Sequence, residues 1–225
     1  EIAVEKIGII HPGNTVVALR QSEDVNTVIE QRCEQQNAQL IWVEAKPDYQ
    51  DSNDAVAVAT VKVLAESDSW TYQPDLASGA FEHIFIPGRF EKRSLYNNLL
   101  ILDGAHNPQK LSALVDHIHT TTESKFTIIL AIAKRKDLSS CIEIIKPIAA
   151  RIIATSIDTN QRHVLRDIST AKEVVSLCQA SGIECKLVEL PTEALELAST
   201  FANPVLATGS FYLLHEVDRV LQQQN

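Results

Sequence analysis

The sequence has 225 residues, 45% of them hydrophobic, and a formal net charge of -9 from 20 basic and 29 acidic residues. This composition is typical of a globular protein with its core in one large domain or two small ones. The acidic balance disfavours nucleic acid and anionic membrane surfaces as partners. No apolar run approaches the roughly 18 residues that a membrane-spanning helix needs.

The four cysteines follow neither a CxxC pattern nor a Cys/His metal-binding spacing. They are Cys33, Cys141, Cys178 and Cys185. Each lies in an apolar or helical context that suits a reduced thiol in the core. A reducing compartment is therefore favoured, and we expect a cytoplasmic protein.

The first 86 residues resemble the trailing strands and helices of an α/β domain. We predict strands at 12–19 and 39–44 and helices at 22–36 and 52–67. The sequence opens at EIAVEKIGII without an initiator Met, and it contains no Met elsewhere, so we expect a piece of a longer protein. A looser stretch, 68–83, then leads to IPGRFEKR, whose Pro87, Gly88 and charge cluster indicate a connection between domains at 87–98.

Residues 99–225 alternate between strand and helix. Apolar runs predict strands at 99–103, 126–132, 151–156, 184–189 and 204–207. Helical spacing predicts inner faces made of Leu111, Leu114, Val115 and Ile118, of Val174, Val175 and Cys178 within 169–180, and of Leu213, Leu214, Val217, Val220 and Leu221. Gly182 suits a left-handed helix stop. This alternation predicts a Rossmann-like domain, a mostly parallel sheet with helices on both faces.

Polar residues gather where the first of these strands meets its helix, in LLILDGAHNP, residues 99–108. Ligands of open α/β sheets bind beyond the carboxyl ends of the strands, where Asp103 is expected. Asn107 can cap the following helix and Pro108 suits its first turn, so the positive end of the helix would face the same place. The pattern favours a phosphorylated or carboxylate ligand. Alternatively, Asp103 and His106 serve only to satisfy backbone groups of the loop.

Four segments together carry a family resemblance: EKIGIIHPG, PGRF, LDGAHNP and ATGSFYLLHEV. Their sequences and their order are similar to those of the folylpolyglutamate synthase / dihydrofolate synthase family, within the Mur-type ATP-dependent amide ligases. The resemblance implies that ATP and Mg²⁺ activate a folate or dihydropteroate carboxylate as an acyl phosphate, which L-glutamate then attacks. It also implies that 1–86 is the C-terminal portion of the central ATPase domain and 99–225 the Rossmann-like C-terminal domain.

The resemblance assigns three residues around the connection and the first strand. Asp103 matches an aspartate that contacts ATP, through the ribose in our interpretation. Arg89 matches an arginine that reaches ATP across the domain boundary, and a planar guanidinium suits phosphate. His106 matches a histidine near the phosphates and the glutamate site, with a catalytic role. For Arg89 the competing interpretation is a surface salt bridge within RFEKR.

Three further residues match the family elsewhere. Asn53 matches a nucleotide-binding asparagine, although asparagine is also common at helix starts. Lys6 matches a catalytic lysine that the family carbamylates to make a carboxylate near Mg²⁺. Ile7 stands where the family usually has Ala, so an ordinary lysine remains the competing interpretation. Ser210 resembles a serine on the glutamate-binding side, with a plain helix cap as its alternative.

One loop departs from the family. KRKD, residues 134–137, has Arg135 where the family tends to carry an acid, while Lys136 and Asp137 match. We assign no role to this loop.

The family's glycine-rich phosphate loop and its Mg²⁺-binding histidine and glutamate precede EKIGII, and the sequence contains no GKS or GKT. We therefore expect a missing N-terminal ATPase half, a monomeric enzyme, and no ATP hydrolysis by these residues alone. The alternatives are a non-catalytic nucleotide- or amino-acid-binding Rossmann-like module, and a Mur-type ligase of another substrate such as a peptidoglycan precursor.

Overall fold

The chain divides into two units in the computed structural model, Glu1–Ile84 and Phe85–Asn225. The structure describes residues 2–74, 80, 84–96, 98–132, 137–156 and 171–223. Within these ranges, no helix is both long and apolar enough to cross a membrane.

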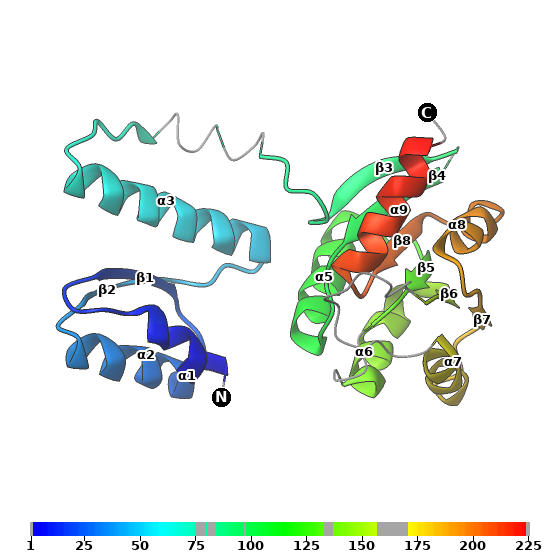
Figure 1. Ribbon diagram of the computed structural model, residues 1–225, viewed down its shortest axis with the longest axis horizontal. Coiled ribbons are helices and arrows are strands. Elements are labelled where there is room, and N and C mark those ends of the chain that lie inside the picture. The colour runs from blue at the N-terminus through cyan, green and yellow to red at the C-terminus, as the bar shows by residue number, and fades with distance from the viewer. Residues whose placement is uncertain are drawn as a thin grey trace. The chain divides into compact units, whose positions relative to one another are not determined.

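The first unit is built on two parallel strands. Its elements are α1 (Ile2–Lys6), the 3₁₀ turn η1 (Ile7–Ile9), β1 (Thr15–Leu19), α2 (Glu23–Gln35), β2 (Gln39–Val43) and α3 (Tyr49–Ser67). β1 pairs with β2 from Thr15 opposite Gln39 to Leu19 opposite Val43. Helices α1 and α2 lie on one face of this pair and α3 lies on the other (Figure 1). The predicted strand-helix order of this part is confirmed.

Helix α3 begins three residues earlier than the sequence pattern predicts. The Asp48 carboxylate accepts a hydrogen bond from the Gln50 backbone N at 2.6 Å, which makes Asp48 the N-cap. A side-chain acceptor at this position satisfies one of the free N–H groups of the first turn, so the helix can start before its apolar face does. Asn53 consequently lies inside the helix, and the alternative of a helix-start role for Asn53 is wrong.

The second unit holds a six-stranded sheet in the order β3-β4-β8-β5-β6-β7. Its elements are β3 (Glu91–Leu95), β4 (Asn98–Asp103), α5 (Pro108–Thr121), β5 (Phe126–Leu130), α6 (Leu138–Ile145), η2 (Lys146–Ile148), β6 (Ala149–Ala154), α7 (Ala171–Ala180), β7 (Cys185–Leu187), α8 (Pro191–Ser199), β8 (Val205–Thr208) and α9 (Phe211–Gln223). β3 is antiparallel to β4, and the other pairs are parallel. The predicted mostly parallel α/β fold is confirmed.

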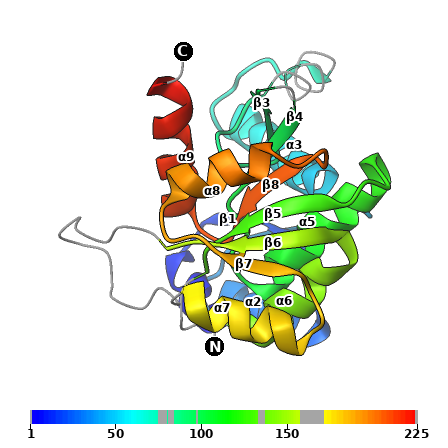
Figure 2. The same ribbon diagram turned by 90° about the vertical axis from the view of Figure 1, so that its right-hand side faces the viewer.

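Alternate strand residues enter two hydrophobic layers, one on each face of the sheet. In β4, Ile101 packs with α5, α6 and α7, whereas Leu100 and Leu102 pack with α8 and α9. The two groups of helices cover opposite faces in Figure 2. Successive side chains of a strand point to opposite faces of the sheet. A parallel sheet with helices on both faces therefore needs apolar residues at nearly every strand position, as found here.

The strand β3 was not predicted, because residues 87–98 were expected to form a connection between domains. Its sequence, EKRSL, is mostly charged, and only Glu91 and Leu95 are buried. An edge strand pairs on one side only, so charged residues on its other surfaces are tolerated and even discourage further pairing. The connection therefore contains a hairpin with β4, which holds the PGRF turn against the end of that strand.

Candidate functional site

The loops after β4 and β8 meet at the carboxyl end of the sheet. β4 and β8 are neighbours, but the helices that follow them, α5 and α9, pack on opposite faces. Ligands of open α/β sheets bind at such points, where the connections that follow two neighbouring strands lead to opposite faces of the sheet. The two loops are joined because Ala105 O accepts hydrogen bonds from Gly209 N at 2.9 Å and from Thr208 Oγ1 at 3.2 Å. Four of the predicted site residues, Arg89, Asp103, His106 and Ser210, belong to this region.

Asp103 ends β4 as a buried carboxylate that is 4% exposed. Its Oδ1 accepts a hydrogen bond from Ala105 N, and its Oδ2 accepts one from Phe90 N, both at 2.8 Å. Burial raises the pKa of Asp103, and the two backbone N–H donors, followed by the charges of Arg89 and His117, lower that pKa by less. The carboxylate therefore ties the turn before β3 to the turn after β4.

Arg89 lies in a turn whose backbone is held from both sides. Gly88 O accepts a hydrogen bond from Gly104 N at 2.9 Å, and Arg89 N donates to Ile86 O at 3.1 Å. Gly88 has φ +69°, a left-handed conformation that favours glycine. The Arg89 side chain is exposed, and its guanidinium carbon lies 5.1 Å from the centre of the Phe211 ring. Among the described residues, Arg89 forms no ion pair; Glu91 of RFEKR pairs with Arg93 instead.

Phe211, the first residue of α9, packs against both glycine-containing turns. A Cβ on Gly104 would lie 2.3 Å from the Phe211 ring, and one on Gly88 would lie 3.1 Å from it. The absence of side chains at these glycines is therefore what lets the ring reach the backbone. The contact places an aromatic surface beneath the Arg89 guanidinium, a favourable position for a cation.

Adding a methyl group at Gly104 should displace Phe211. We expect Gly104→Ala to lower the free energy of unfolding of the second unit by about 1–3 kcal/mol, the usual cost of overpacking. Far-UV circular dichroism during urea unfolding measures this loss. Gly8→Ala is the control, since nothing lies within 4 Å of a Cβ there. Adding Phe211→Ala should restore part of the lost stability. Equal losses for the single and double variants would contradict the proposed clash.

His106 lies between the Asp103 loop and α5. Its Nδ1 is 2.8 Å from Gly104 O. Because a carbonyl oxygen only accepts, Nδ1 must carry the hydrogen, and Nε2 is then the atom of the neutral ring that can accept a proton or a hydrogen bond. The ring centre is 6.5 Å from that of Phe211. His106 and Arg89 are thus both close to the Phe211 ring, and one ring nitrogen of His106 is hydrogen-bonded.

Two helix N-termini adjoin this cluster. The Asn107 side chain accepts a hydrogen bond from Lys110 N at 2.9 Å and Pro108 is the first residue of α5, so the predicted cap is confirmed. Ser210 Oγ accepts a hydrogen bond from Tyr212 N at 3.2 Å, and Ser210 O accepts one from Leu214 N at 3.2 Å. Ser210 therefore has the geometry of a helix cap, which is the alternative role named for it above. Its predicted contact with glutamate stays a prediction.

Lys6 and Asn53 belong to the first unit. Lys6 ends α1 and Asn53 lies in the second turn of α3, on elements that cover opposite faces of the β1–β2 pair. Both residues are exposed. The structure does not bring these two side chains together, and their predicted roles stay predictions.

The described residues do not form a metal site by themselves. Among them, no group of three or more His, Cys, Asp or Glu residues has an arrangement that could hold a metal ion. We therefore derive no step through Mg²⁺, and the predicted role of Lys6 stays a prediction. Of the KRKD loop, only Asp137 is described: it caps α6, accepting hydrogen bonds from Ser140 N at 3.1 Å and Ser140 Oγ at 2.6 Å. These bonds lower the pKa of Asp137.

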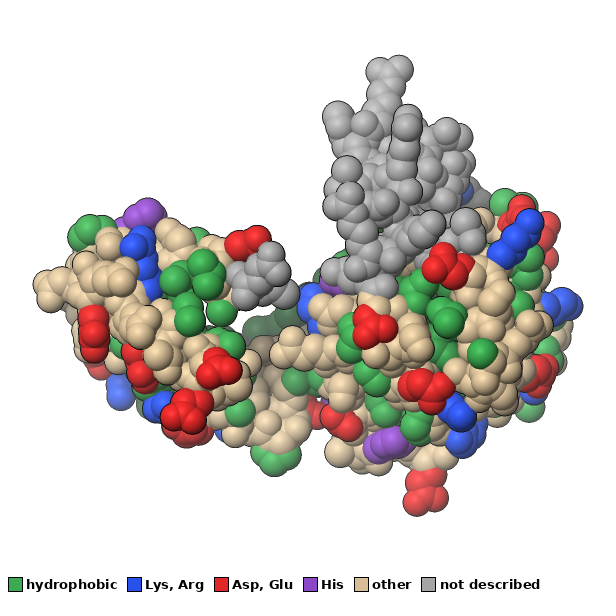
Figure 3. All heavy atoms as spheres, turned by 90° about the horizontal axis from the view of Figure 1, so that it is seen from below, with side chains coloured by type: hydrophobic (Ala, Val, Ile, Leu, Met, Phe, Trp, Pro, Cys, Tyr) green, Lys and Arg blue, Asp and Glu red, His purple; other side chains and the backbone are tan. Residues whose placement is uncertain are grey.

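A hollow of about 370 Å³ lies elsewhere in the second unit, lined by residues of the β6 and β7 ends and of α8 and α9, among them Ser156, Glu189 and Arg219. None of the predicted site residues lines it. On the face of the molecule drawn in Figure 3, Lys and Arg side chains lie scattered among Asp and Glu. We therefore place the candidate site at the β4 and β8 ends, on the convergence of side chains rather than on the depth of a hollow.

Glu91 and Phe211 lie at this candidate site but were not predicted from the sequence. Glu91 is buried and binds the Gly88 backbone N, and Phe211 underlies Arg89. Each stands next to a quoted motif, since Glu91 follows PGRF and Phe211 follows Ser210. That adjacency was the only available signal for either residue.

Comparison with known proteins identifies the family. Residues 89–222 match the sequence profile described as dihydrofolate synthetase, C-terminal domain. The chain belongs to this family. The matched range includes Arg89, Asp103, His106 and Ser210, and the family resemblance stated from the LDGAHNP and neighbouring segments is confirmed.

Curated and solved relatives agree with this family. A folylpolyglutamate synthase from Lacticaseibacillus casei is 27% identical over 176 residues, which are 77% of this chain and 39% of that protein. A Mycobacterium tuberculosis folylpolyglutamate synthase, solved with ADP and AMPPCP, has a TM-score of 0.82 at 18% identity, over 97% of this chain and 58% of the other. A bifunctional Yersinia pestis folylpolyglutamate synthase/dihydrofolate synthase, solved with AMPPNP and a Mn ion, has a TM-score of 0.78 at 17% identity, over 98% and 56%. This chain thus covers less than two thirds of the length of each of these relatives.

Proposed function

We propose that this chain is the C-terminal part of an ATP-dependent ligase that joins L-glutamate to a folate or dihydropteroate carboxylate through an acyl phosphate. The observation that carries the proposal is that Arg89, His106 and Ser210 lie together near the carboxyl ends of β4 and β8, in a chain of the dihydrofolate synthetase family. Several solved structures that cover the chain contain adenine nucleotides, and two of them also contain Mn.

For each step of such a reaction, the candidate site contains a chemical group that could take part in it. Phosphoryl transfer from ATP spreads negative charge over the transferred group, and an exposed guanidinium held on a fixed turn can stabilise that charge. The Nε2 atom of His106 can take a proton from the attacking amine or contact the acyl phosphate. The N-terminus of α9, at Ser210, offers backbone N–H groups to a carboxylate of glutamate. ATP and Mg²⁺ would supply the activation.

Asp103 has a different role in this proposal from the ribose contact that the resemblance implies. Both of its oxygens already accept backbone hydrogen bonds, and the residue is 4% exposed. We therefore assign Asp103 to fixing the Arg89 turn, and assign the contact with ATP to Arg89. Lys6 and Asn53 are retained as candidates in the first unit, for metal and nucleotide respectively.

Calorimetric titration of residues 1–225 with ATP and with L-glutamate tests whether these residues form a complete ATP-binding site or only part of one. A chain that supplies only part of a two-domain site should bind ATP weakly, with a Kd on the order of a millimolar or above, and should release no phosphate. The gene product that includes the upstream half should form an amide with glutamate in an ATP-dependent manner. Micromolar ATP binding by residues 1–225 would instead support a self-sufficient binding module, and ATP turnover by them would refute the proposal.

A further inference from the structure

Glu91 is a buried carboxylate that the proposed reaction does not use directly. Its side chain is 3% exposed. Oε2 accepts a hydrogen bond from Gly88 N at 2.8 Å, and Oε1 accepts one from Arg93 Nε at 2.5 Å. A buried carboxylate is costly unless it is paired and hydrogen-bonded, and both conditions are met here. Glu91 therefore holds the residue just before Arg89 by a charge-assisted bond.

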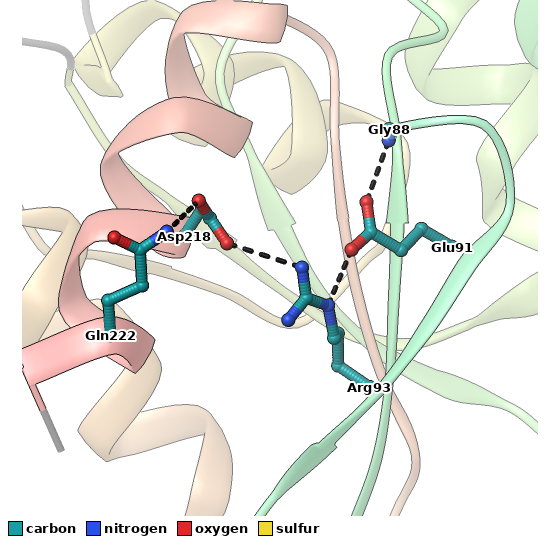
Figure 4. Close-up of polar contacts among 5 residues, drawn as sticks. All are labelled: Gly88, Glu91, Arg93, Asp218 and Gln222. Carbon is teal, nitrogen blue, oxygen red and sulfur yellow. Dashed lines mark hydrogen bonds and ion pairs between the residues drawn. The ribbon is translucent and has the colours of Figure 1, made fainter. Parts of the chain in front are cut away.

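The contacts continue from Glu91 to α9. Arg93 Nη2 lies 3.4 Å from Asp218 Oδ1, and Gln222 Nε2 donates to Asp218 Oδ2 at 2.6 Å. Figure 4 shows the unbroken series from the Gly88 backbone through Glu91, Arg93 and Asp218 to Gln222. The β3 strand is thus connected to α9 by side chains as well as by the packing of the sheet.

The same helix also contacts the Arg89 side chain. Phe211, which lies 5.1 Å from the Arg89 guanidinium carbon, precedes Asp218 by seven residues on α9. Residues seven apart are two turns apart and share a helix face. One face of α9 therefore reaches Arg89 in two ways, directly through the Phe211 ring and indirectly through Asp218, Arg93 and the backbone of Gly88.

We propose that Glu91 is a positioning residue for Arg89, which sets the Gly88–Arg89 turn and, through Arg93 and Asp218, fixes that turn relative to α9. The inference rests on the proposed function, in which Arg89 contacts the phosphates of ATP. A guanidinium binds phosphate through two directed N–H groups, so a small shift of its backbone costs much of the interaction. Glu91 touches no substrate in this scheme.

The first experiment measures steady-state kinetics of the complete ligase with Glu91→Gln, which keeps the shape of the side chain and removes its charge. We expect kcat/KM for ATP to fall about tenfold, which corresponds to about 1.4 kcal/mol, while the KM for glutamate changes by less than about twofold. Asp218→Asn, at a more exposed position, should lower kcat/KM for ATP by about two- to threefold. Glu216→Gln is the matched control, because Glu216 is a partly buried carboxylate of α9 that pairs with Arg219.

A double-mutant cycle separates positioning from a merely structural role. If Glu91 acts through Arg89, Glu91→Gln should cause no further loss of kcat/KM in an Arg89→Ala enzyme. In residues 1–225, exchange of the Gly88 amide hydrogen should accelerate at least about tenfold with Glu91→Gln, while amides of β5 stay protected. A loss that adds fully to that of Arg89→Ala, or an unchanged Gly88 amide, would overturn the inference. An inactive wild-type ligase would instead overturn the proposed function, since the exchange result does not depend on activity.

Discussion

In the complete ligase that we propose, Arg89→Ala should reduce kcat/KM for ATP by about 10²–10³-fold, with no loss of folded protein. The expectation follows from the cost of removing one preorganised group that stabilises charge in a transition state. Arg89 is exposed and, among the described residues, forms no ion pair, so its removal should leave the second unit intact. The measurement is the initial rate of phosphate release at varied ATP, with glutamate and the pterin substrate saturating.

Two further variants test whether the loss of activity in Arg89→Ala comes from the guanidinium of Arg89. Arg89→Lys keeps the charge and loses the planar fork, so it should recover only part of the rate. Arg219→Ala removes an arginine from α9 that pairs with Glu216 at 2.7 Å, and it should leave kcat/KM within about twofold of the wild type. If Arg89→Ala behaved like Arg219→Ala, Arg89 would have no part in handling ATP.

Local patterns in the sequence were sufficient for the elements that bring this site together. The apolar runs of β4, β5 and β8 identify buried strands because residues on both faces enter a core. The Asn107–Pro108 pair marks the start of α5 because capping depends on residues close in sequence. Gly182, with φ +70°, ends the helix before β7 as predicted. Signals of this kind require no knowledge of distant contacts.

The parts that were missed depend on contacts between residues far apart in the chain. Phe211 underlies Arg89, 122 positions earlier (211 minus 89), and no local pattern encodes that contact. Glu91 in RFEKR resembles a surface charge, and it is buried only because Gly88 N and Arg93 satisfy it. The two backbone donors of Asp103 were hidden for the same reason: a carboxylate at a strand end suggests a ligand contact, and only the tertiary structure shows that Phe90 N and Ala105 N already bind it. Sequence patterns thus indicated candidate residues, and the tertiary structure showed which of their polar groups are already hydrogen-bonded within the protein.

Asp103→Asn should lower the free energy of unfolding of the second unit by about 2 kcal/mol at pH 7. An amide offers one acceptor where the carboxylate offers two, so either Phe90 N or Ala105 N loses its partner inside the protein. The measurement is urea unfolding followed by far-UV circular dichroism. Trp42 and Trp70 both lie in the first unit, so tryptophan fluorescence of the same samples supplies an internal control that should not change.

The pH dependence of this difference gives a sharper test. Burial raises the pKa of Asp103 above its ordinary value of 3.8, so the folded state keeps a proton that the unfolded chain has lost. The unfolding free energy of the wild type should therefore fall, relative to that of Asp103→Asn, as the pH rises from about 3.8 through the folded-state pKa, and should be level above it. Unfolding at several pH values between about 4 and 7 measures the trend. If the unfolding free energy of the wild type instead rose with pH relative to that of Asp103→Asn, the pKa of Asp103 would be lowered in the folded state. The two N–H donors and the charge of Arg89 would then affect this pKa more than burial does.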